Sequence, residues 1–118
     1  MNPNERDTLV DQVVTEIYDA YPWLWAEFGQ HGRERTKEDN YHHIDHLYTA
    51  YEMKSAVFFI DYTLWLQNVL TSRGIGNKLI IDNYERLIQN LEMMEWESKA
   101  EKHSFVHHLK LALGSLRD

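Results

Sequence analysis

Histidine spacing is the first feature of this sequence that could support chemistry. Seven histidines occur among 118 residues. His42 and His46 lie four residues apart, and so do His103 and His107. Residues four apart share one face of a helix, so each pair can direct two imidazoles at one metal ion. The two pairs together would form a four-nitrogen site between two helices, which makes a metal-binding helical protein one hypothesis.

The carboxylates near these histidines do not have the spacing that a metal site of this kind requires. A di-iron helical bundle repeats a Glu-x-x-His motif on two helices, but no glutamate stands three residues before any histidine here. Asp39 stands three residues before His42, without a second copy of that pattern. Haem ligation by a histidine is open in principle, although the lack of cysteine excludes thioether attachment. We therefore expect no haem and no functional metal, and keep a metal- or haem-binding protein as the alternative.

The sequence contains no recognisable catalytic motif. Its serines lie in no nucleophile elbow, and Gly74 and Gly76 alone do not make a phosphate-binding loop. Without cysteine there is no thiol nucleophile. We therefore predict that the protein is not an enzyme.

A stripe of apolar residues that ends in an arginine is the strongest chemical signal. Its members recur at spacings of three and four residues and are Phe58, Tyr62, Trp65, Leu66, Val69 and Arg73. That spacing places them on one helix face. Such a wall can hold an amphipathic acid, with the tail on the wall and the carboxylate on the guanidinium. The alternative is that Arg73 only offsets the carbonyl dipoles at its helix end. On the preceding helix a second stripe grades from polar to apolar: Asp39, His43 and Leu47.

Helices must position these residues, and the pattern predicts one all-α domain, residues 1–118, of about six helices. Apolar residues recur at helical spacing, and strict polar–apolar alternation is absent. The 56–72 helix is apolar around most of its circumference, which predicts that it runs through the middle of the fold. The expected helices are Glu5–Ala20 capped by Asn4, Trp23–Phe28 ended by Gly29, Arg33–Met53, Ala56–Ser72 capped by Ser55, Lys78–Trp96 capped by Asn77, and a last helix that begins with a Ser98–Glu101 capping box and ends near Leu116.

Composition excludes several classes of partner. The net charge of −7 and the scattered basic residues argue against nucleic acid. No apolar run approaches the roughly 20 residues of a membrane span, and the polar start is no signal peptide. With no cysteine, we expect a cytoplasmic protein. Surplus apolar residues on the last two helices favour a homodimer, namely Ile81, Ile88, Val106 and Leu111.

Two segments resemble a known family. They are YPWLWAEFGQHGRERTKEDNYHHIDHLYTA and FFIDYTLWLQNVLTSRGI, in which EDNYHH and YTLWLQNVLTSRG are the most specific motifs. They resemble the non-haem globin sensor domains of Bacillus-type sporulation histidine kinases, and the free-standing sporulation-inhibitory proteins that copy such a domain. The likeness covers about Tyr21 to Leu91. It implies a dimeric, globin-like fold that holds a fatty acid instead of haem, with a chloride ion nearby.

The resemblance also implies roles for individual residues. By position, Arg73 in TSRG is expected to engage the carboxylate, with Arg33 and Arg35 as reserves. The chain would be a sensor module without a kinase region, acting on a sensor histidine kinase by titrating its signal or by pairing with it. A pure interaction module is the third hypothesis. The chamber or tunnel would be lined by His43, Tyr62 and Trp65.

Overall fold

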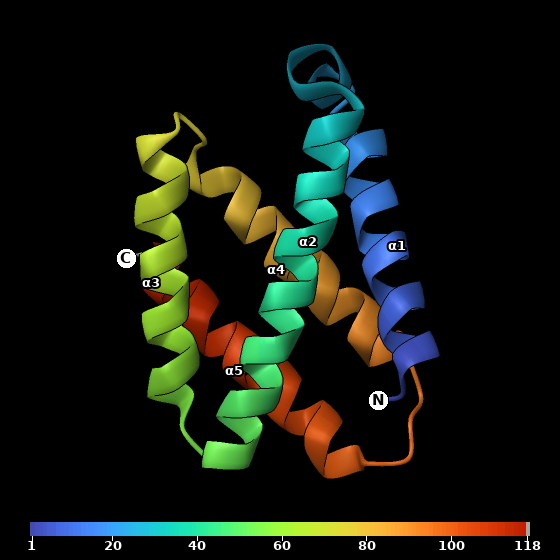
Figure 1. The fold of residues 1–118 in the computed structure, drawn as a ribbon. Helices are drawn as coiled ribbons and strands as arrows, with labels where there is room; N and C mark the ends of the chain where they lie inside the picture. The colour runs from blue at the N-terminus through green and yellow to red at the C-terminus, as the bar shows by residue number, and fades with distance from the viewer. Residues whose placement is uncertain (118) are drawn as a thin grey trace.

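The computed structural model describes residues 1–117, which form five α-helices and contain no strand. In Figure 1, α1, α2 and α3 stand in a front layer, and α4 and α5 cross behind them. Helix α5 packs against α2, α3 and α4, while α1 packs against α2 and α4. The all-helical prediction is confirmed. The helices are α1 (Pro3–Ala20), α2 (Trp23–Met53), α3 (Ala56–Ser72), α4 (Asn77–Met93) and α5 (Lys99–Arg117).

Helix α1 begins two residues earlier than predicted. Its N-cap is Asn2, not Asn4, and Asn2 forms a reciprocal capping box with Glu5, each backbone N–H donating to the other side chain over 2.8 Å. Pro3 occupies the first helical position, where its missing N–H costs no hydrogen bond. The apolar stripe of α1 lies in the core, since Val10, Val13, Val14, Ile17 and Tyr18 are all buried.

The later helix starts agree with the sequence in part. Ser55 caps α3 by accepting a hydrogen bond from the backbone of Phe58, as predicted. Gly76, rather than Asn77, is the N-cap of α4. The Asn77 side chain instead donates to the carbonyl of Leu116 over 2.7 Å, which ties the start of α4 to the end of α5. The sequence missed this because the acceptor lies 39 residues away.

The two helices predicted before and after Gly29 form one helix, α2, with a kink. Gly29 has φ +62° and ψ −160°, a conformation that glycine adopts without strain. After the kink the chain turns tightly, so a Cβ on Gly32 would lie 2.3 Å from the Cβ of Phe28. Counted with α2 as one element, the chain has five helices rather than six, but Gly29 interrupts α2 with non-helical backbone where the sequence predicted the Trp23–Phe28 helix to end.

Helix α3 does not run through the middle of the fold, and that prediction was wrong. It lies at one edge of the molecule (Figure 1). Val57 and Trp65 are 63% and 60% exposed, and Leu64 is also exposed. The helix buries only Phe59, Tyr62, Thr63 and Leu66. The apolar residues around α3 therefore line an open groove and an exposed face, and the helix is not buried on all sides.

The apolar surplus that favoured a homodimer is largely used within one chain. Ile88 belongs to the core, and Ile81 and Val106 pack partly buried against it. Of the four residues, only Leu111 is exposed. Within residues 1–117 no helix is both long and apolar enough to cross a membrane. Homodimerisation stays a prediction, but the apolar residues of α4 and α5 no longer support it.

Candidate functional site

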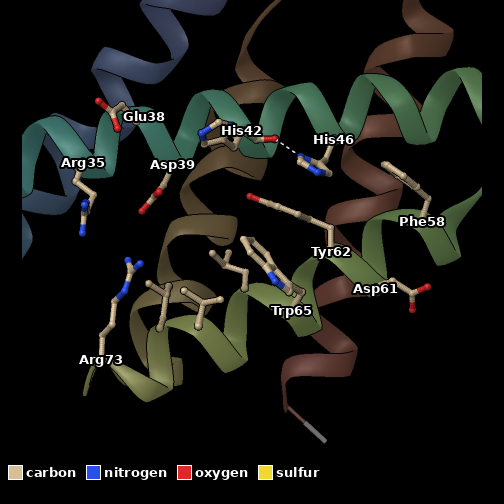
Figure 2. Close-up of a pocket in the computed structure, with 13 residues that line it drawn as sticks. Arg35, Glu38, Asp39, His42, His46, Phe58, Asp61, Tyr62, Trp65 and Arg73 are labelled. Atoms are coloured by element: carbon tan, nitrogen blue, oxygen red, sulfur yellow. Dashed lines mark hydrogen bonds between the residues drawn. The ribbon is translucent and has the colours of Figure 1, made fainter.

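A groove of about 680 Å³ runs between α2 and α3. Small-molecule sites typically enclose roughly 300–1,000 Å³. The α3 side of the groove carries the whole stripe identified in the sequence, because helical phase keeps its members on one face. Figure 2 shows these side chains facing those of α2 across the groove. The α3 residues that line it are Phe58, Asp61, Tyr62, Trp65, Leu66, Val69 and Leu70, followed by Arg73.

Stacked rings form the wall at the end of the groove farther from Arg73. His46 of α2 stacks on Tyr62 with ring centroids 3.8 Å apart and planes 17° apart, and it also stacks on Phe58 at 5.7 Å. Tyr62 in turn stacks on Trp65 at 6.1 Å. His46 is fixed from its own helix, because its Nδ1 lies 2.7 Å from the carbonyl oxygen of His42. The result is a continuous aromatic surface with one exposed member, Trp65.

The other end of the groove is charged and contains two arginines. Figure 2 shows the Arg35 side chain on α2 and the Arg73 side chain after α3 directed toward one another. Arg73 is the C-cap residue of α3, yet its side chain lines the groove. Within residues 1–117 neither guanidinium forms an ion pair with a carboxylate. Two unpaired guanidinium groups across a groove can bind an anion, and their planar fork matches a carboxylate or a phosphate group.

Asp39 lies beside the two arginines and is half-buried. Burial raises the pKa of its carboxyl, and the smaller opposing effects of His42, Arg35 and Arg73 do not cancel that rise. This carboxyl is therefore more easily protonated than one on the surface.

A smaller, more enclosed chamber of about 200 Å³ lies behind the charged end. It shares five lining residues with the groove, so the two cavities meet there. Apolar side chains from three helices, α1, α2 and α4, surround the rest of it, including Ile17, Leu24, Phe28 and Ile80. The shared residues are Arg35, Asp39, Leu66, Leu70 and Arg73.

His43 closes the chamber from the protein interior. Its side chain is 3% exposed, and its Nδ1 shares a 2.7 Å hydrogen bond with the Tyr62 hydroxyl. Burial lowers the pKa of His43 to about 3, with smaller contributions from His46 and His42. Burial also raises the pKa of Tyr62. Both groups are therefore neutral at physiological pH. Their hydrogen bond fixes the Tyr62 ring, on which His46 and Trp65 stack.

This neutral histidine predicts a loss of stability in acid. The unfolded chain binds a proton near the ordinary histidine pKa of 6.5, whereas folded His43 binds one only near 3. Stability is therefore complete above about pH 6.5 and falls as pH drops toward 3, by about 1 kcal/mol at about pH 5.5. Urea unfolding across this range should show a shallower decline for His43→Gln than for the parent. His42→Gln, an exposed control, should keep the parental slope; equal slopes for all three proteins would contradict the prediction. His108, whose pKa burial also lowers, would account for a residual decline.

The structure brings together most, but not all, of the site residues predicted from the sequence. Leu47 is fully buried in the core and lines neither cavity. Arg33 donates to the Thr15 hydroxyl over 3.1 Å and lies outside the groove, so Arg35 is the reserve arginine that lines it. His43 lines the inner chamber rather than the groove. His46 was not predicted as a groove residue, because its i, i+4 spacing was interpreted as metal ligation.

The two histidine pairs do not converge. His46 and His42 line the groove, whereas His103 and His107 line a separate surface pocket with Glu92 and three lysines. Among residues 1–117 no three histidine or acidic side chains lie close enough to hold one metal ion. The four-nitrogen site between two helices is therefore not formed.

Comparisons of the chain with protein-family models, with curated proteins and with solved structures give no match.

Proposed function

We propose that this protein binds an amphipathic monocarboxylic acid of the fatty-acid class in the groove between α2 and α3. One observation carries the proposal: an aromatic and aliphatic wall ends at Arg73, with Arg35 opposite it across the groove. The tail would lie along Tyr62, Trp65 and Val69, and the carboxylate would lie between the two guanidinium groups. The guanidinium groups of Arg35 and Arg73 are solvent-exposed, and their charge-assisted hydrogen bonds to a carboxylate are stronger than those between neutral groups.

The proposed biological role rests on the resemblance stated above. A fatty-acid-binding sensor domain of this kind would modulate a sporulation sensor histidine kinase, by titrating its signal molecule or by pairing with it. The chloride ion that the resemblance implies would lie near the bound carboxylate. The role needs no catalytic group, no haem and no metal.

The exposed indole of Trp65 provides a direct test of the proposed groove. A bound tail covers this ring, which is 60% exposed, so its fluorescence should shift to shorter wavelength on titration with saturated fatty acids. Each buried methylene contributes about 0.8 kcal/mol, or roughly fourfold in affinity, so the affinity should rise with chain length until the groove is full. Titrations kept below the critical micelle concentration of each acid measure both effects.

A matched pair of tryptophan variants identifies the binding surface. Trp65→Ala should remove the spectral shift and weaken binding, whereas Trp23→Ala, which alters an equally exposed ring outside the groove, should leave both unchanged. An affinity that does not change with chain length, or an unaltered affinity in Trp65→Ala, would exclude the groove as the site.

A further inference from the structure

We infer that Asp39 selects the ligand's head group and couples its binding to proton uptake: when an anion lies between Arg35 and Arg73, the Asp39 carboxyl is protonated and donates a hydrogen bond to it. The inference rests on the proposed function, because it assigns a third residue to the same head-group site. A protonated Asp39 would make the site selective for acids over uncharged lipids, and this selectivity would depend on pH.

The position of Asp39 carries this inference. It is one of five residues that line both cavities, and it stands where they meet, on the same helix as Arg35 and one turn further along. Figure 2 shows its carboxyl directed into the groove, toward the space between the two arginines. Within residues 1–117 it forms no ion pair and no side-chain hydrogen bond that would commit it to a structural role. An anion bound between the guanidinium groups would therefore adjoin a carboxyl with no other partner.

Two carboxylates in one shielded site repel each other, so one of them takes a proton. Burial alone already raises the pKa of Asp39, and a bound anion raises it further. The affinity for an anion is therefore highest at a pH below the ligand-free pKa of Asp39. It falls as the pH rises from the ligand-free to the ligand-bound pKa of Asp39, and it does not change further above the ligand-bound pKa. Between those two values each bound anion takes up one proton from solvent.

Other charged groups around Asp39 must be separated from its effect. On α2 these are Arg35, Glu38 and His42, with His43 on the chamber side, and on α3 they are Asp61 and Arg73. Tyr18 of α1 lines the chamber, and α4 contributes no acidic or basic side chain to either cavity. His42 and His46 also line the groove. A variant of Asp39 keeps those histidines, so the difference between parent and variant isolates the carboxyl.

The test uses an alkyl sulfonate, because its head group stays charged throughout the pH range, with a primary alcohol of equal chain length as the uncharged probe. Binding of both is measured by calorimetry near pH 5 and pH 8, in the parent and in Asp39→Asn. At about pH 8 the variant should bind the sulfonate about tenfold more tightly than the parent, since one pKa unit corresponds to tenfold in affinity. That advantage should shrink as the pH is lowered toward 5, because the Asp39 carboxyl of the parent takes up a proton. Alcohol binding should not change between the two proteins.

Proton uptake gives a second readout that a purely structural role would not produce. At a pH between the ligand-free and the ligand-bound pKa of Asp39, the binding enthalpy of the sulfonate to the parent should depend on the ionisation enthalpy of the buffer, and this dependence should be weaker in Asp39→Asn. Equal sulfonate affinities of parent and variant at both pH values, or an equal gain for the alcohol, would overturn the inference while leaving the acid-binding groove in place. No sulfonate binding to either protein would overturn the proposed function and the inference together.

Discussion

Arg73→Ala should weaken the binding of a fatty acid by roughly tenfold to a hundredfold. A charge-assisted hydrogen-bonded pair that is partly shielded from water is worth roughly 1.5–3 kcal/mol, which corresponds to that loss. Arg73→Lys should recover only part of it, because an ammonium group cannot reproduce the planar two-pronged contact. Calorimetric titration with one saturated acid measures all three proteins. Arg33→Ala is the matched control, since Arg33 lies outside the groove on Thr15.

The Arg73 variants also separate ligand binding from a role at the helix end. As the C-cap residue of α3, Arg73 could favour folding by offsetting the helix dipole. In that case Arg73→Ala would lower the melting temperature and leave affinity unchanged. Parental affinity in Arg73→Ala would refute the carboxylate assignment and, with it, the orientation of the ligand.

Asn83→Leu should lower the free energy of unfolding by roughly 2–3 kcal/mol, which corresponds to a melting temperature roughly 10 °C lower. Asn40 and Asn83 form a reciprocal amide pair between α2 and α4, with N···O distances of 3.0 and 2.7 Å. Asn40 is fully buried, so removing Asn83 leaves a polar amide in the core without its acceptor across the helix interface. Thermal unfolding followed by circular dichroism measures the change.

The double variant Asn40→Leu/Asn83→Leu should regain much of that stability, because two apolar side chains of similar shape leave no unsatisfied amide. Asn68→Leu, at an exposed position on α3, is the control and should have little effect. If the double variant were less stable than Asn83→Leu by a further 2 kcal/mol or so, the two asparagines would act independently rather than as a pair.

Local signals in the sequence predicted the parts of the site that lie on one helix. The α3 stripe is encoded by spacings of three and four residues, so its shared face and its end at Arg73 follow from helical geometry alone. The Ser55 cap likewise depends on atoms only three residues apart. The break at Gly29 was likewise predicted from a local signal, because glycine readily adopts the positive φ that interrupts α2 there.

The residues on the α2 side of the groove could not be predicted from the sequence, because they depend on how α2 faces α3. Leu47 and His46 are neighbours on α2, yet Leu47 points into the core while His46 stacks on Tyr62. Arg33 and Arg35 were equivalent by position, and only the rotation of α2 directs Arg35 toward Arg73 and Arg33 toward α1. Periodicity specifies which residues share a face but not which helix that face meets.

By itself, the sequence determined an all-helical chain and an apolar stripe on the 56–72 segment that ends in an arginine. Tertiary structure decided that α3 lies at the edge, that its stripe borders an open groove, and that Arg35 and Asp39 lie near Arg73. The physical reason is the range of the interactions: a helix is fixed by hydrogen bonds between residues four apart, whereas a groove is fixed by the packing of helices distant in sequence. Here α2 and α3 contact each other beside the groove, and α5 packs behind both of them.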